Sequence, residues 1–237
     1  FRDCNAWYHI VAALDSTESA NADKVKLYIN GIQQTLSGST FPSSAIGFNN
    51  SGSKFNIGKS DRYANFDFDG TMSHYHFIDG TAYPASTFGS TDSVTGQWQI
   101  NTSPSVTYGD QGFFILKDGN SVTDQSGEGN NLTVSTGTLT QTEDSPSNVF
   151  ATMNPLIYST GNNTTLSNGN TTVTSSGASH KNAFSSLGVS SGKWYCEIEV
   201  DTLNTHQKIG VASDDNVEIN KTSPSEFSGN ANGYAYR

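Results

Sequence analysis

Three acidic residues at every second position, Glu197, Glu199 and Asp201, are the first candidates for chemistry in this sequence. They occur in the run KWYCEIEVD, residues 193–201, and alternate side chains of a β-strand point to the same face. Neighbouring members of such a row are about 6.7 Å apart, which falls within the roughly 6.5–9.5 Å that an inverting glycosidase needs between its carboxyl groups. The opposite face carries four residues typical of a buried row, Trp194, Cys196, Ile198 and Val200. Because a half-buried strand needs only this alternation, we interpret the acidic row as a solvated strand face and expect no catalytic residue.

Two other patterns resemble metal sites. His74 and His76 share a strand face in the run SHYHF, and two imidazoles at this spacing can ligate a metal. No third ligand at a suitable spacing is evident, so we expect ordinary surface or interface histidines. The run DQSGEGNN, residues 124–131, concentrates oxygen donors in a Gly-rich loop, as calcium loops do. It lacks the regular Asp spacing of an EF-hand, so an Asx-rich turn is favoured over calcium binding. We predict no metal and no cofactor.

The run SDRYANFDFDG packs aromatic and charged residues into a short linker. Tyr63 and Phe66 can stack on a sugar ring, while Asp61, Arg62 and Asn65 offer hydrogen bonds. Tyr, Phe and Arg are also enriched at subunit interfaces. We therefore predict that these five residues form a ligand-binding or interface site, with both alternatives open.

The amino-acid composition limits the classes of partner that are expected. Of the 237 residues only 14% are charged, against roughly 25% in ordinary domains, and Ser, Thr, Asn and Gly are abundant. The net charge is −10, with 12 Lys and Arg in total, so the basic face that nucleic acid requires is not expected. No apolar run approaches the roughly 20 residues of a membrane span. A surface rich in hydroxyls, amides and aromatic rings suits neutral polyhydroxylated ligands.

The elements that position these residues read as strands bounded by Gly, Asn, Asp or Ser, and no segment shows helical periodicity. In KVKLYINGIQQ, residues 24–34, the pair Asn30-Gly31 predicts a hairpin, because both residues tolerate positive φ. A single helical turn is expected within 83–89. Further strands are expected over residues 7–15, 54–60, 68–80, 111–119 and 193–201. The predicted fold class is all-β, with antiparallel sandwich units.

The two cysteines, Cys4 and Cys196, lie far apart, each within an apolar pattern. They form neither a disulfide framework nor a zinc motif. We expect both to be buried and reduced, as free cysteines commonly are.

Several runs resemble known families. The run LYINGIQ, with Trp7-Tyr8-His9, Ile57-Gly58 and the later FDG and HFIDG, resembles the C-terminal half of a laminin-G-like, concanavalin A-type jelly roll. GFFILKDGNSVTDQSGEGNNLT looks like the opening strand and loop of such a unit. SSGKWYCEIEV and KIGVAS look like the start of a SPRY domain. This succession is similar to tail-fibre and other virion proteins of tailed bacteriophages.

The resemblance implies a jelly-roll part over 1–89, a connecting region over 90–147 and a SPRY-like part over 148–237. The chain is then expected to be a piece of a longer virion protein that binds host-surface glycan, other virion proteins and further copies of itself, with a trimer as the first guess. The alternatives are a capsid decoration without a ligand and a virion-associated glycan hydrolase.

Overall fold

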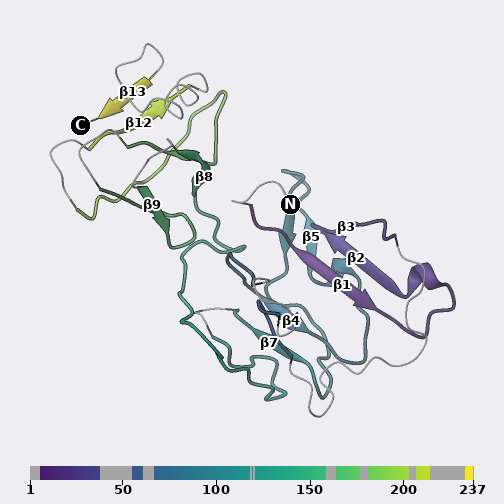
Figure 1. Cartoon of the computed structure of the whole chain (residues 1–237). Helices are drawn as coiled ribbons and strands as arrows, with labels where there is room; N and C mark the ends of the chain where they lie inside the picture. The colour runs from purple at the N-terminus through teal and green to yellow at the C-terminus, as the bar shows by residue number, and fades with distance from the viewer. Residues whose placement is uncertain are drawn as a thin grey trace. The chain divides into compact units, whose positions relative to one another are not determined.

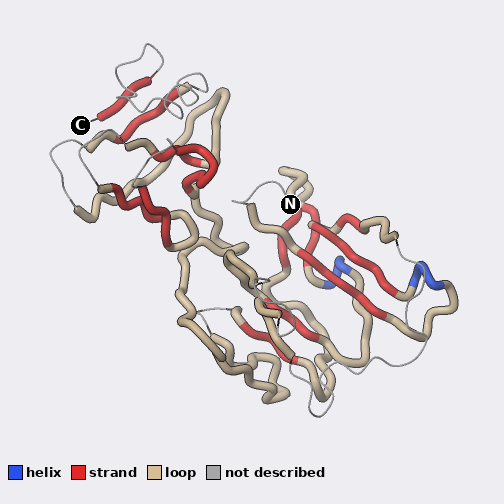
Figure 2. Tube along the Cα trace, viewed as in Figure 1, coloured by secondary structure: helices blue, strands red, loops and turns tan. Residues whose placement is uncertain are grey.

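The computed structural model describes residues 6–37, 55–60, 67–117, 119, 121–158, 164–176, 181–202, 207–213 and 233–236. The chain divides into two compact units, here called the first unit, Trp7–Asn148, and the second unit, Val149–Arg237 with Phe1–Ala6. Across the described residues, thirteen strands pair antiparallel, and two single 3-10 turns are the helical segments (Figures 1 and 2). The prediction of an all-β antiparallel fold is confirmed. Among the described residues, no helix is long and apolar enough to cross a membrane.

A three-stranded sheet, in the order β1-β2-β3, opens the first unit. Its strands are β1 (Ile10–Leu14), β2 (Val25–Ile29) and β3 (Ile32–Gln33), and the 3-10 turn η1 (Asn21–Asp23) precedes β2. Asn30 and Gly31 join β2 to β3 with φ angles of 48° and 76°. Two positive φ angles are the signature of a two-residue type I′ hairpin, so the hairpin predicted at this pair is confirmed.

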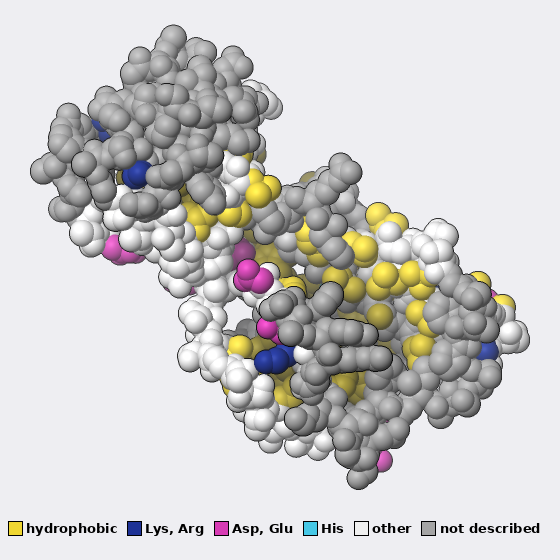
Figure 3. Space-filling view, viewed as in Figure 1, with side chains coloured by type: hydrophobic (Ala, Val, Ile, Leu, Met, Phe, Trp, Pro, Cys, Tyr) yellow, Lys and Arg dark blue, Asp and Glu magenta, His cyan; other side chains and the backbone are white. Residues whose placement is uncertain are grey.

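One face of this sheet is wholly apolar. The β1–β2 register pairs Ile10 with Ile29, Ala12 with Leu27, and Leu14 with Val25, and directly paired residues share a face. Ile32 of β3 joins them opposite Ile29. Ile10, Leu14 and Ile32 are exposed, and hydrophobic side chains gather over this part of the first unit in Figure 3.

A second hairpin holds a large aromatic side chain. β5 (Gly89–Thr91) follows the 3-10 turn η2 (Ala85–Thr87) and pairs with β6 (Trp98–Ile100). The turn η2 confirms the helical turn predicted within 83–89. The Trp98 indole lies directly against Gly31 and Gly89, where any β-carbon would overlap it. Trp98 therefore joins the hairpin β5–β6 to the turn between β2 and β3.

The core of the first unit lies around two short strands. β4 (Tyr75–Phe77) pairs with β7 (Phe113–Ile115), so that His76 lies opposite Phe114 and Phe77 opposite Phe113. All three β7 side chains are buried, and burying one such side chain contributes roughly 1.5–3 kcal/mol. Buried hydrophobic residues in this unit are Ala85, Phe88, Tyr108, Phe113, Phe114 and Ile115. Residues 90–147 thus contribute strands to the same unit as residues 7–89.

The strands predicted over 54–60 and 68–80 are shorter than expected. Residues 55–60 form no strand, and Gly58 there has a φ of 76°. Within 68–80 only β4 is a strand. His74, directly before it, has a φ of 50°, a left-handed conformation that interrupts a strand.

The second unit consists of paired strands. β8 (Met153–Tyr158) pairs with β11 (Ala183–Ser185), β9 (Thr164–Ser167) with β10 (Thr172–Ser175), and β12 (Ile209–Ala212) with β13 (Gly233–Tyr236). The turn from β9 to β10 uses Asn168, Gly169 and Asn170, all with positive φ. Asn and Gly adopt this conformation at little cost, which explains the turn at this point.

Candidate functional site

The five residues predicted as a ligand or interface site, Asp61, Arg62, Tyr63, Asn65 and Phe66, lie outside the described residues. Their role stays a prediction, and the candidate sites described below consist of other residues.

The acidic row of residues 193–201 does not stand on a strand. Residues 193–200 pair with no strand among the described residues and are all exposed, and Trp194, which the alternation placed in a buried row, is 72% exposed. The prediction of a strand with a buried face is therefore wrong here. Alternation provides an apolar face, but a strand also needs a neighbour for its backbone groups and a layer over that face. Glu197 is exposed as expected, and its Oε1 accepts a hydrogen bond of 2.5 Å from the Tyr195 hydroxyl.

The prediction of two buried cysteines is wrong for Cys196. This cysteine is free and exposed, because it belongs to the same unpaired segment. Cys4 lies outside the described residues.

His76, expected to be an ordinary surface or interface histidine, is half-buried among aromatic rings. Its ring stacks on Phe114 at a centroid distance of 3.9 Å, and its Nδ1 is 2.8 Å from the Tyr108 hydroxyl. Burial, with smaller effects of His74, His9 and Lys117, lowers the pKa of His76 to about 4. His74 hydrogen-bonds through Nδ1 to the Ser73 hydroxyl at 2.7 Å. Among the described residues, no three His, Cys, Asp or Glu side chains are grouped so as to hold a metal ion.

The loop 124–131 is organised around the Asp124 carboxylate. Its Oδ1 accepts from the backbone N–H of Phe114 and of Ser126, and its Oδ2 accepts from the Ser126 hydroxyl and the Asn130 N–H. Burial acts to raise the pKa of Asp124, but these hydrogen bonds outweigh it, so the pKa lies below its usual value. The carboxylate thus holds the loop against β7, as an Asx turn does.

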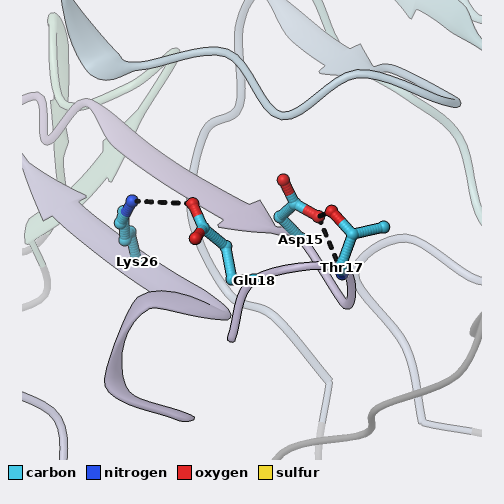
Figure 4. A network of polar contacts seen from close by, with 4 residues as sticks. All are labelled: Asp15, Thr17, Glu18 and Lys26. Atoms are coloured by element: carbon cyan, nitrogen blue, oxygen red, sulfur yellow. Dashed lines mark hydrogen bonds and ion pairs between the residues drawn. The ribbon is translucent and has the colours of Figure 1, made fainter. Parts of the chain in front are cut away.

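A small hollow with a volume of about 120 Å³ lies on the first unit beside β1 and β2. Its wall includes Asp15, Glu18 and Lys26, shown with Thr17 in Figure 4. The Asp15 carboxylate accepts from the Thr17 hydroxyl at 2.6 Å and from the Thr17 N–H at 2.9 Å, and these bonds lower its pKa. Lys26 and Glu18 form an ion pair of 3.9 Å. These groups partner one another, and the volume is below the roughly 300 Å³ of a small-molecule pocket.

The larger hollow lies in the second unit and has a volume of about 310 Å³. Residues of β8, β9, the β9–β10 turn and β11 line it: Asn154, Pro155, Thr164, Thr165, Leu166, Asn170 and Ala183. The Met153 N–H donates to the Asn170 carbonyl at 2.8 Å, which ties β8 to the turn. The described lining residues carry amide and hydroxyl groups and apolar surface, and none of them is ionisable.

Thr164 supplies the unusual group of the larger hollow. Its side-chain Oγ1 is buried and has no hydrogen-bond partner. An unsatisfied buried hydroxyl costs roughly 1–3 kcal/mol, so such a group calls for an explanation. The larger hollow is therefore the candidate functional site.

Sequence reasoning did not find this site. Its residues come from three strands and a turn, and Asn and Thr are so frequent here that their local spacing carries no signal. In comparisons with known proteins, no protein family, curated protein or solved structure matches the chain.

Proposed function

We propose that this chain is a non-catalytic, glycan-binding module of a surface appendage of a tailed bacteriophage. The larger hollow, with its uncharged lining and the unpartnered Thr164 hydroxyl, is the observation that carries the glycan-binding part. The virion assignment rests on the resemblance of the jelly-roll and SPRY-like runs, and the all-β antiparallel fold is compatible with both.

A neutral sugar matches the chemistry of the hollow. Ligand pockets start at roughly 300 Å³ and combine apolar surface with a few polar groups that fix orientation. The larger hollow reaches that size, and Asn154, Thr165 and Asn170 supply amides and a hydroxyl beside Leu166 and Pro155. The buried Thr164 Oγ1 becomes accessible by a small movement on binding, and a sugar hydroxyl then gives it the partner that it lacks.

A binding role is favoured over hydrolysis by the exposed carboxylates. Glu197 and Glu199 lie in a solvent-exposed segment, whereas the general acid of a glycosidase such as lysozyme lies in a hydrophobic pocket. Assembly as a homo-oligomer, with a trimer as first expectation, and contacts with other virion proteins belong to the same proposal.

The direct test is a binding screen of the whole chain on an array of neutral and acidic glycans, repeated with Thr164→Val. This change keeps the β-branched shape and removes only the hydroxyl. We expect binding of neutral glycans that falls at least tenfold in Thr164→Val, with unfolding free energy unchanged or higher by about 1 kcal/mol, because an unsatisfied group is removed. Thr174→Val, on an exposed position of β10, is the matched control and leaves binding unchanged.

Three outcomes separate the parts of this proposal. If no neutral glycan binds, the glycan-binding function is wrong. If glycans bind equally to Thr164→Val, the function stands but the larger hollow is not the site. In that case Tyr63→Ala with Phe66→Ala tests the segment predicted from sequence, where loss of glycan binding or of self-association is expected.

A further inference from the structure

His9 lies at a junction of the first unit. Its backbone N–H donates to Asn30 Oδ1, and its carbonyl accepts from the Asn30 N–H, each at 2.8 Å. Its ring Nδ1 accepts from the Trp98 indole Nε1–H at 2.9 Å. Residues 89 positions apart in the chain therefore meet at one imidazole.

The Trp98 bond fixes the protonation state of His9. The indole N–H is only a donor, so Nδ1 of His9 has to be an acceptor. The ring is then neutral and carries its proton on Nε2. A second proton on the ring turns Nδ1 into a donor, which sets two N–H groups against each other at 2.9 Å and breaks the bond.

The position of Trp98 is restricted by two glycines. The half-buried indole lies so close to Gly31 and Gly89 that a β-carbon on either would overlap it. Its ring also stacks with that of His9, at a centroid distance of 5.9 Å. Losing the bond to His9 therefore disturbs the packing between the β2–β3 turn and the hairpin β5–β6.

His76 provides a second imidazole that acid will charge. It is enclosed by aromatic rings, stacked on Phe114 and Tyr108 and tilted against Phe88. Burial of the neutral ring lowers its pKa, and the same cause, followed by the charge of His74, lowers the pKa of His9. Burial thus opposes the charged form of both rings.

The groups facing these rings offer little compensation. Among the described residues, the neighbours that act on the charge of His76 are His74 on the same segment, His9 before β1 and Lys117 after β7, and all are cationic or become so in acid. Tyr108 contributes a hydroxyl whose pKa burial raises to about 12, so that it stays neutral. Asp124, which acts on Tyr108, already accepts four hydrogen bonds in its own loop.

We propose that His9 with Trp98 and His76 with Tyr108 form an acid-sensitive latch, which holds the β5–β6 hairpin at neutral pH and releases it when the imidazoles are protonated. Above about pH 6.5, the usual histidine pKa, both rings are neutral and the latch is closed. As the pH falls below that value, protonation first breaks the donor–acceptor pair at Trp98. The charge on His76 then adds repulsion between imidazolium groups.

The test is a pH titration, from 7.5 to 4, of the three indole N–H signals in a nitrogen–proton NMR spectrum of the whole chain. The Trp98 signal is expected to move upfield with a midpoint below pH 6.5. The Trp194 signal should stay in place, because its N–H donates to the Ser191 carbonyl, which does not titrate. Trp98→Phe and Trp194→Phe assign the signals.

His9→Gln is the matched variant, because an amide oxygen can accept the indole bond but does not titrate in this range. We expect its Trp98 signal to stay fixed between pH 7.5 and 5, and His74→Gln to raise the midpoint seen in the parent chain. A Trp98 signal that does not move in the parent chain contradicts the latch. A signal that moves equally in His9→Gln contradicts it as well. If His9→Gln does not fold, the imidazole carbon shifts of His9 in the parent chain decide, since the latch requires them to titrate together with the Trp98 signal.

Discussion

In the first unit the side chains of Phe113, Phe114 and Ile115 are buried, whereas in the second unit Trp194, Tyr195 and Ile198 are exposed. Both units have alternating apolar patterns and antiparallel strands. The buried polar residues of the second unit include Thr152 and Asn182, while many of its described larger apolar side chains face solvent. Similar alternating patterns thus give buried apolar side chains in the first unit and exposed ones in the second.

The difference follows from which segments meet. In the first unit two aromatic runs pair over a long sequence distance, so that β4 and β7 lie side by side, and Phe88 and Tyr108 pack against His76 and Phe114. In the second unit the β9–β10 pair is a local hairpin with exposed residues on alternate positions. An apolar face is buried only when a second layer packs on it.

The largest expected difference is between two aromatic truncations. Phe114→Ala, at a position 5% exposed, should lower the unfolding free energy by about 3–5 kcal/mol, because it leaves a cavity beside His76. Trp194→Ala should change it by no more than about 0.5 kcal/mol, as exposed sites do. Urea unfolding followed by circular dichroism measures both. Equal costs would mean that Trp194 is buried in solution and would break the comparison.

A pair of glycines sharpens the contrast. Gly89→Ala should cost about 1–3 kcal/mol, since the new β-carbon would lie 2.6 Å from both the Gln99 carbonyl oxygen and the Trp98 ring. Gly188→Ala, in the second unit, meets no atom within 4 Å and should be neutral or slightly stabilising. Thermal unfolding of the two variants measures both effects. A Gly89→Ala variant as stable as the parent chain would show that Trp98 is loosely packed.

The first unit should also lose stability in mild acid. The folded pKa of His76 is about 4 against 6.5 for the free side chain, so the unfolded state binds more protons between these values. The stability is therefore complete above pH 6.5 and falls as the pH drops toward 4, by about 2 kcal/mol between pH 7 and 5. Urea unfolding at both pH values measures the loss. His76→Gln should show a clearly smaller loss over this range, and an unchanged slope would assign the effect to other groups.

The smallest effects are expected at the exposed acids of the second unit. Glu197→Gln and Glu199→Gln should each change the unfolding free energy by at most about 0.5 kcal/mol, because neither side chain is buried. Chemical denaturation checks this value. A glycan-cleaving activity that vanished in these variants while stability held would replace the binding role with a catalytic one.

Local signals in the sequence predict local structure well. The hairpin at Asn30-Gly31 follows from two residues that tolerate positive φ, and the turn at Ala85–Thr87 is also found where expected. Strands were predicted correctly where the partner strand exists, as at Phe113–Ile115. The run 193–201 has equally good alternation but no partner among the described residues, so its strand and its buried face were predicted wrongly.

The sites depend on contacts that sequence spacing does not encode. The positions of His74 and His76 suggested a shared face, yet a left-handed residue at His74 and the approach of Phe114 decide where the rings lie. The bond from Trp98 to His9 joins residues 89 positions apart, and the lining of the larger hollow gathers residues from three strands and a turn. Only the fold brings these groups together.

The central claim is that the larger hollow binds a neutral sugar. The most direct measurement is a titration of the isotope-labelled whole chain with neutral monosaccharides and their oligomers, observed through the side-chain NH₂ signals of Asn154 and Asn170. Both signals should shift in a saturable way with a neutral sugar. The NH₂ signal of Asn130, which donates to the Asp110 and Gly112 carbonyls in the first unit, should stay fixed. Shifts confined to other residues, or none with any neutral sugar, would contradict a glycan site in this hollow.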